Sequence, residues 1–351
     1  MRKDLDPSTL RVCYVNITPG DFSRSGVHIH ALIQRGVQVA SCLDHSPGIR
    51  KFWEIYKKHR ALRGAYDVVI VGYPAYILVP FARLISRKPI LFDAGWSLYE
   101  GTIVARGLYA HQPLRRLYYW AIDWLACRSA HMVLLESEHQ IAYYQKLLRV
   151  PAAKMRRLFT GVDETLFSLN LAPQKREVFT VLFRGYANPE AGLAHIVSVA
   201  RALESEGIHF LVISPNARLK DLPKNVEYRE GFFDRVELCE WMQSCHASIG
   251  HVSTNERLER TIPHKAFEAM LLKLPFVMAD VAAIREILDE GSSVLVRPGD
   301  EGDIAAQLRK LRDDSDLRDR IAEMAYSTYQ KRCANAVLSG ELIEHIRMML
   351  D

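Results

Sequence analysis

The chain has 351 residues, which is too long for one ordinary hydrophobic core and fits two domains of roughly 150 residues each. Hydrophobic residues make up 49% of it and charged residues 25%, which excludes disordered, collagen-like and coiled-coil classes. The net charge of +5 hides an asymmetry: residues 1–165 hold 23 Lys and Arg against 13 Asp and Glu, and residues 166–351 hold 23 against 28. The basic first half suits nucleic acid, an anionic membrane surface or a phosphorylated substrate, and composition does not choose among them.

The chain carries no obvious targeting signal. No apolar run reaches 18 residues, and charges and a proline occupy the place of a secretory signal. The six cysteines lie far apart and lack the spacing of metal ligands. We therefore expect a cytoplasmic protein with reduced thiols.

Strand and helix patterns alternate along the first half of the chain. A turn-rich loop follows the first strand, and a helix over residues 27–36 follows that loop. The predicted strands cover residues 11–17, 37–43, 67–72, 89–93 and 131–136. Continuous apolar strands between helices predict a parallel sheet covered on both faces.

The alternation restarts after a polar stretch at 168–177, which we interpret as a linker. The predicted strands then cover residues 179–184, 210–214, 226–228, 247–252, 276–279 and 293–296. We predict an α/β fold with two Rossmann-like, doubly wound domains, 1–168 and 169–330, and a C-terminal helix, 331–351, that returns to the first domain. Ligands bind at the carboxyl ends of such sheets, so the expected site is the cleft between the two domains.

The segment 260–274, RTIPHKAFEAMLLKL, is the most informative stretch of the sequence. Thr261 is a plausible N-cap and Pro263 suits a first helical turn, so a helix is predicted with Arg260, His264 and Glu268 on one stripe. Cations beside the free N–H groups of a helix start form an anion site of the kind that a diphosphate occupies. The alternative for Glu268 is a surface ion pair with Lys265.

This stretch resembles the signature of retaining glycosyltransferases of family 4, which have the GT-B fold. The matching residues are Ile262-Pro263-His264-Lys265, Glu268-Ala269-Met270 and Lys273-Leu274-Pro275-Phe276-Val277. The resemblance covers nearly the whole chain and includes Gly161-Val162-Asp163, Phe183-Arg184-Gly185, Gly231-Phe232-Phe233 and Pro298-Gly299-Asp300. It implies transfer of a sugar from a nucleotide-sugar donor to an acceptor hydroxyl, with retention and without a metal or other cofactor.

Three positions depart from the family pattern. Arg260 stands where the family usually has its first Glu, while Tyr186 and Ala191 stand where it commonly has two diphosphate cations. We interpret this as a relocated phosphate clamp of Arg260, Lys265 and Arg184; the alternative is a chain that has lost donor binding. Glu268 is expected to accept hydrogen bonds from both ribose hydroxyls.

The resemblance implies further donor-binding residues. The nucleobase is expected near Phe232, although Phe is more often a core residue. His251 is expected to face the sugar, or else to be a buried histidine with a satisfied hydrogen bond. Gly185 follows the strand that opens the second domain, and Ser25 and Gly26 are expected in a loop that approaches the donor phosphate.

The acceptor is expected on the first domain. Asp93, at the carboxyl end of a strand, is our candidate for contacting the acceptor hydroxyl or assisting its deprotonation. Basic and aromatic residues at 50–64 and 112–128 suit an anionic membrane surface, which would fit a glycan or lipid-linked acceptor, or else ordinary half-buried helices. No metal site or nucleic-acid partner is predicted, and a GT-B epimerase of nucleotide sugars or a non-catalytic GT-B scaffold remain open alternatives.

Overall fold

The computed structural model describes residues 6–18, 23–165, 167 and 173–351, and these form two compact units. Unit 1 comprises Met1–Asp163 and Ala334–Asp351, and unit 2 comprises Glu164–Cys333. The chain thus changes unit after residue 163, where the sequence predicted a change after 168. Residues 168–172 of the predicted linker lie outside the described residues.

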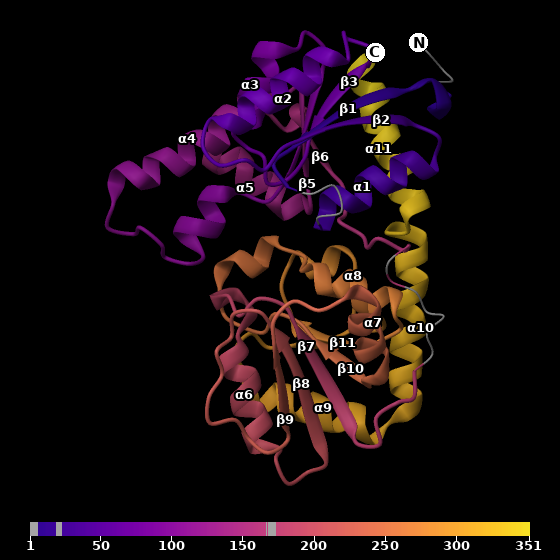
Figure 1. The fold of residues 1–351 in the computed structure, drawn as a ribbon. Coiled ribbons are helices and arrows are strands. Elements are labelled where there is room, and N and C mark those ends of the chain that lie inside the picture. The colour runs from indigo at the N-terminus through magenta and orange to yellow at the C-terminus, as the bar shows by residue number, and fades with distance from the viewer. Residues whose placement is uncertain (1–5, 19–22, 166, 168–172) are drawn as a thin grey trace. The chain divides into compact units, whose positions relative to one another are not determined.

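Unit 1 is built on a six-stranded parallel sheet in the order β2-β1-β3-β4-β5-β6, counted over the residues described (Figure 1). Every residue of β3, β4 and β5 is buried, as expected for parallel strands covered on both faces. The strands are β1 (Arg11–Asn16), β2 (Gln38–Leu43), β3 (Val68–Val71), β4 (Ile90–Gly95), β5 (Met132–Leu135) and β6 (Met155–Arg157). The helices are α1 (Ser23–Gln34), α2 (Arg50–Ala61), α3 (Leu78–Ile85), α4 (Pro113–Ser129), α5 (Glu138–Leu148) and α11 (Asn335–Leu350).

The C-terminal helix α11 belongs to unit 1, as the sequence predicted. It packs against α1, and Nε of Arg35 donates to Oγ of Ser339 over 3.2 Å. Among the helices that the structure describes, none is long and apolar enough to span a membrane.

Unit 2 repeats this architecture with a six-stranded parallel sheet in the order β12-β11-β10-β7-β8-β9, again within the described part of the chain. Its strands are β7 (Phe179–Arg184), β8 (Ile208–Ser214), β9 (Val226–Glu230), β10 (Ala247–Ile249), β11 (Phe276–Ala279) and β12 (Val294–Val296). Its α-helices are α6 (Leu193–Ala202), α7 (Arg235–Ser244), α8 (His264–Leu271), α9 (Glu301–Asp313) and α10 (Ser315–Arg332), and three short 3₁₀ helices are η5 (Pro189–Ala191), η6 (Glu256–Arg260) and η7 (Ile284–Glu286). The prediction of two doubly wound α/β domains is confirmed.

Candidate functional site

In the sheet of unit 2, the direction in which successive strands are added reverses between β7 and β10. These strands are neighbours, and the chain continues from β7 toward β8 but from β10 toward β11. Open α/β sheets bind ligands at the carboxyl edge beside such a reversal. Arg184 is the last residue of β7, and His251 lies two residues beyond the end of β10. The candidate donor site is therefore at this edge.

Helix α8, whose N-terminus belongs to this edge, begins later than the sequence predicted. Its N-cap is Pro263 in an extended conformation, and not Thr261, while Arg260 is the last residue of the separate helix η6. The prediction that Arg260 shares a helical stripe with His264 and Glu268 is therefore wrong. A proline restricts the residue before it to extended conformations, so the helix cannot include Ile262.

Glu268 is fully buried and lies at the centre of an ionic cluster. Nη1 of Arg184 contacts both carboxylate oxygens, with 2.6 Å to Oε2, and Nδ1 of His264 lies 3.0 Å from Oε1. Burial alone would raise the pKa of Glu268, but the Arg184 charge and the His264 contact outweigh it and hold the pKa at about 2. The alternative of a surface ion pair with Lys265 is therefore wrong.

Lys265, the second residue of α8, is a buried cation without a counterion in direct contact. Its Nζ is buried and has no hydrogen-bond partner among the described residues; it lies 4.0 Å from the centroid of the Phe183 ring. Burial, followed by the charge of Arg184, lowers the pKa of Lys265 to about 7. A Cβ on Gly185, whose φ is +129°, would lie 3.5 Å from this Nζ, so the glycine leaves open space beside the ammonium group.

Two histidines add unsatisfied nitrogens to the same edge. Nδ1 of His251 and Nε2 of His264 are buried, and neither finds a hydrogen-bond partner in the part of the chain that the structure describes. Burial, together with the charges of Lys265 and Arg257, holds the pKa of His251 well below its usual value. His251 as a whole is half-buried and its buried Nδ1 is not satisfied, so it differs from the alternative of a buried histidine with a satisfied hydrogen bond.

A second buried ion pair borders this edge and was missed by the sequence. Nη1 of Arg257 lies 2.5 Å from Oε1 of Glu190, and both side chains are almost fully buried. Ala191, where the family commonly has a Lys, lies in the core. No local sequence pattern signals this pair, because Glu190 and Arg257 are 67 residues apart.

Phe232 is a surface residue and not part of the core. It is 79% exposed, follows Gly231 at the end of β9, and packs edge-on against Tyr186 with 6.2 Å between ring centroids. Tyr186 is 53% exposed and follows Gly185 at the end of β7. Two exposed aromatic rings thus stand beside the ionic cluster on the carboxyl edge.

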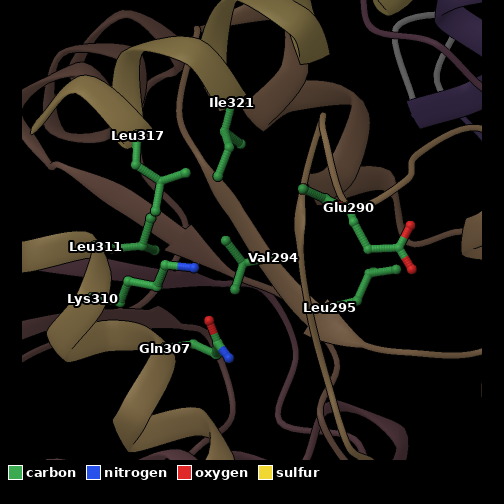
Figure 2. A pocket seen from close by; sticks show the side chains of 9 residues that line it. Glu290, Val294, Leu295, Gln307, Lys310, Leu311, Leu317 and Ile321 are labelled. Atoms are coloured by element: carbon green, nitrogen blue, oxygen red, sulfur yellow. The ribbon is translucent and has the colours of Figure 1, made fainter. Parts of the chain in front are cut away.

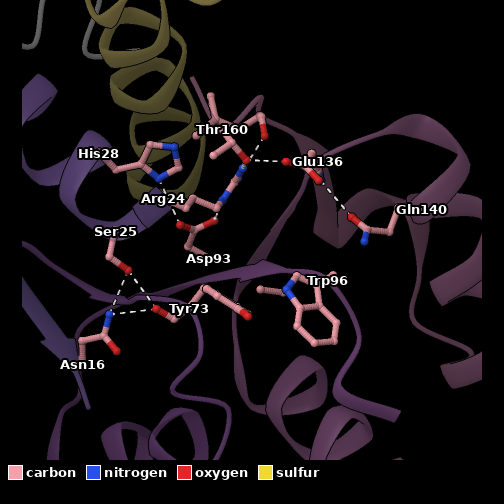
Figure 3. Close-up of polar contacts among 12 residues, drawn as sticks. Asn16, Arg24, Ser25, His28, Tyr73, Asp93, Trp96, Glu136, Gln140 and Thr160 are labelled. Atoms are coloured by element: carbon pink, nitrogen blue, oxygen red, sulfur yellow. Dashed lines mark hydrogen bonds and ion pairs between the residues drawn. The ribbon is translucent and has the colours of Figure 1, made fainter. Parts of the chain in front are cut away.

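Asp93 lies in a buried polar cluster of unit 1 (Figure 3). Its Oδ1 accepts from Nε of Arg24 over 2.7 Å, and its Oδ2 lies 3.0 Å from Nδ1 of His28. Burial alone would raise the pKa of Asp93, but Arg24 and His28 hold it at about 2. Nε2 of His28 is buried and makes no hydrogen bond to any described residue.

The predicted loop position of Ser25 and Gly26 is wrong, because both residues lie in the first turns of α1. Oγ of Ser25 donates to the carbonyl of Tyr73 over 2.9 Å and accepts from Nδ2 of Asn16 over 2.8 Å (Figure 3). Ser25 therefore holds the carboxyl ends of β1 and β3 together.

Helix α4 exposes an apolar stripe. Spacings of three and four residues place its exposed large side chains on one face, whereas Asp123, Ala126 and Cys127 are buried on the other. No Asp or Glu stands between Glu100 and Asp123, whereas Arg115 and Arg116 lie in the first turn of α4. The stripe is formed by Leu114, Leu117, Tyr118, Trp124 and Leu125.

A small pocket elsewhere in unit 2 does not gather the predicted site residues (Figure 2). Its volume is about 210 Å³, and it is lined by Ser293 and Val294 at the amino end of β12 and by residues of α9 and α10 such as Lys310. It therefore lies at the edge of the sheet opposite the carboxyl ends. Across the described residues, no group of three or more His, Cys, Asp or Glu side chains is placed to hold a metal ion.

Part of unit 2 is similar to a known protein family. Residues 178–314, which include the ionic cluster around Glu268, match the family described as glycosyl transferases group 1. Alpha-D-kanosaminyltransferase from Streptomyces kanamyceticus is 22% identical over 272 residues. That match covers 73% of this chain and 66% of the relative, so it spans a little under two thirds of that protein's length.

Two solved structures share the architecture over nearly the full chain. HepE from Anabaena, in complex with UDP-glucose, has a TM-score of 0.71 at 15% identity and covers 97% of this chain and 100% of its own. Sucrose-phosphate synthase from Thermosynechococcus elongatus has a TM-score of 0.72 at 13% identity, with 97% and 99% covered. The chain therefore has the GT-B fold.

Proposed function

We propose that the protein is a glycosyltransferase that binds a nucleotide sugar at the carboxyl edge of the unit 2 sheet. The observation that carries this proposal is the buried Nζ of Lys265, which faces the space left by Gly185 and has no hydrogen-bond partner within the described residues. A buried ammonium group without an acceptor is costly, and a diphosphate would supply acceptor oxygens. The match to group 1 glycosyl transferases and the UDP-glucose bound by HepE support the same ligand class.

The donor diphosphate is proposed to be held by Lys265, Arg184, Arg260 and the N-terminus of α8. Positive groups and free N–H donors stabilise the charge that develops on a leaving diphosphate, so no metal is required for that step. Glu268 would accept from the ribose hydroxyls, as the resemblance implies. Because Arg184 now contacts both Glu268 oxygens, this contact requires the guanidinium to move from one of them toward the phosphates.

The nucleobase is proposed to stack on the exposed rings of Phe232 and Tyr186. Aromatic faces at the end of β7 and β9 offer a stacking surface without requiring a particular base. By the same resemblance, His251 and Gly185 are proposed to be the other donor-binding residues of unit 2, with His251 facing the sugar. Tyr186, which stands where the family commonly has an Arg, would then contact the base by stacking and not the diphosphate by charge.

The acceptor is proposed to bind unit 1 at the polar cluster of Asp93. A carboxylate with a pKa of about 2 is a poor base, so Asp93 is proposed to orient His28 through its Nδ1, which leaves Nε2 as the atom proposed to take the proton of the acceptor hydroxyl. Transfer is proposed to proceed with retention, which the resemblance to family 4 supports. The anomeric coupling constant of the product, measured by ¹H NMR, tests this directly.

The acceptor is further proposed to be a glycan or lipid-linked molecule at an anionic membrane surface, where a cytoplasmic protein would dock through α4. The exposed stripe of α4 combines five large apolar side chains with neighbouring arginines. We expect the protein to float with vesicles that contain phosphatidylglycerol, and to be released as salt is raised. Leu117→Glu should abolish flotation, whereas Arg297→Glu on the surface of unit 2 should leave it largely intact. Equal binding to neutral vesicles at all salt concentrations would contradict the docking proposal.

A thermal-shift panel of nucleoside diphosphates and nucleotide sugars tests the donor site. Ligand binding to the folded state raises stability by RT ln(1 + [L]/Kd), so a binding nucleotide raises Tm in a concentration-dependent manner. Lys265→Met should remove this shift, and Lys273→Met, which changes a surface lysine after the same helix, should keep it. A wild-type protein that binds no nucleotide would favour a scaffold, and release of epimerised donor without an acceptor would favour an epimerase.

A further inference from the structure

The charged side chains around Lys265 neutralise one another without it. Charged groups on four elements surround it: Arg184 at the end of β7, Glu190 on η5 and Glu268 on α8 act on it directly, and Arg257 on η6 pairs with Glu190. Glu268 is paired with Arg184, and Glu190 with Arg257. The remaining titratable neighbours are His251 and His264. Two cations therefore neutralise two carboxylates, and an ammonium group at Lys265 adds a positive charge that no described side chain neutralises.

From this arrangement we propose that Lys265 is largely uncharged in the free protein above neutral pH and takes up a proton when the donor diphosphate binds. This inference rests on the proposed function, because it assigns a chemical behaviour to the same donor site. The proton comes from solvent and joins the Nζ lone pair, and no covalent bond to the donor forms.

The geometry explains why the proton is not held without a ligand. Nζ lies against the Phe183 ring, which offers a cation–π attraction but no hydrogen-bond acceptor, and beside Gly185. Burial and the Arg184 charge both disfavour the ammonium form, in agreement with a pKa of Lys265 at about 7. A diphosphate in the space beside Gly185 reverses this balance because it brings two negative charges and acceptor oxygens.

The proposal predicts a measurable proton uptake. If the pKa of the free site is about 7 and the bound lysine is fully protonated, binding takes up ~0.1 proton at pH 6 and ~0.9 at pH 8. The apparent Kd of the donor should accordingly rise about tenfold from pH 6 to pH 8. A permanently charged lysine would show neither change.

Isothermal titration calorimetry of the full chain measures this uptake. The probe is the nucleotide sugar that gives the largest thermal shift, with UDP-glucose tried first, because its phosphodiester groups do not titrate between pH 6 and pH 8. At each pH the observed enthalpy is recorded in buffers of different ionisation enthalpy, and the slope gives the number of protons. The same titration of Lys265→Arg serves as the control, since a guanidinium is charged in both states.

We expect the slope of the wild-type protein to increase from pH 6 to pH 8 and that of Lys265→Arg to stay near zero. Binding without proton uptake in the wild-type protein overturns the inference and leaves the proposed function standing. Uptake that persists in Lys265→Arg assigns the proton to another group, such as His264, and also overturns it. Failure of every nucleotide sugar to bind instead contradicts the proposed function.

Discussion

Replacing Glu268 by Gln isolates the central charge of the donor site at almost constant volume. The carboxylate is fully buried and contacts Arg184 and His264, so the substitution removes one partner of a buried ion pair. Such a loss typically costs about 3–5 kcal/mol. The Arg184 side chain is 30% exposed and can turn toward water, which places the expected cost at the lower end, about 3 kcal/mol.

The pKa of Glu268 gives a second route to this magnitude. The folded pKa of about 2 lies below the ordinary glutamate pKa of 4.5. At 1.36 kcal/mol per unit, this difference corresponds to about 3 kcal/mol of folding free energy. Because the pKa is depressed in the folded state, the contribution is complete above pH 4.5 and is lost as the pH falls toward 2. Glu268→Gln should lack this acid-dependent component.

Differential scanning calorimetry of the full chain tests both estimates. For a domain of 150–250 residues, about 3 kcal/mol corresponds to a Tm decrease of roughly 6–12 °C at pH 7. The control is Glu323→Gln, which changes the exposed partner of Lys273 and should shift Tm by no more than about 2 °C. Similar small shifts in both variants would refute the assignment of Glu268 to a buried ionic cluster.

Three other substitutions test the remaining buried charges. Asp93→Asn should lower the free energy of unfolding by about 3 kcal/mol at pH 7, since it leaves Arg24 without its buried partner, and urea unfolding measures this loss. Burial raises the pKa of Asp123 to about 7. The stability that protonated Asp123 contributes is therefore complete below pH 3.8 and is lost as the pH rises to 7. Asp123→Asn should flatten the dependence of Tm on pH over that range. Lys265→Met should raise Tm at pH 6, because it removes a buried ammonium group, and should at the same time abolish the nucleotide-induced shift.

The sequence predicted the strands of the donor unit better than the helix at its centre. The predicted strands 179–184 and 276–279 have the bounds of β7 and β11, because continuous apolar runs mark buried parallel strands. The start of α8 was predicted too early, although Pro263 carried the relevant signal. A proline at the first turn is compatible with a helix, but it also keeps the preceding residue extended.

The ionic partners could not be predicted from local patterns. Arg184 and Glu268 are 84 residues apart, and Arg24 and Asp93 are 69 residues apart. Periodicity shows which face of a single element is buried, but it does not show which side chain of another element meets it. The expected role of Glu268 toward ribose therefore omitted the guanidinium that now covers its oxygens.

The two buried clusters differ in how well their charges are satisfied, and this difference points to the ligand. In unit 1, both oxygens of Asp93 have partners, and Arg24 also donates to Thr160 and to the carbonyl of Leu158, whereas one nitrogen of the cluster, Nε2 of His28, lacks a partner among the described residues. In unit 2, His251, His264 and Lys265 each hold a buried side-chain nitrogen without a hydrogen-bond partner among the described residues. Folded proteins rarely leave such groups unsatisfied, because each costs free energy, so a concentration of them on one sheet edge is best explained by an anion that binds there during function. If the cluster had only a structural role, a neutral residue in place of Lys265 would raise the stability of the protein and would not change the binding of any nucleotide. The paired stability and binding measurements on Lys265→Met distinguish these two cases.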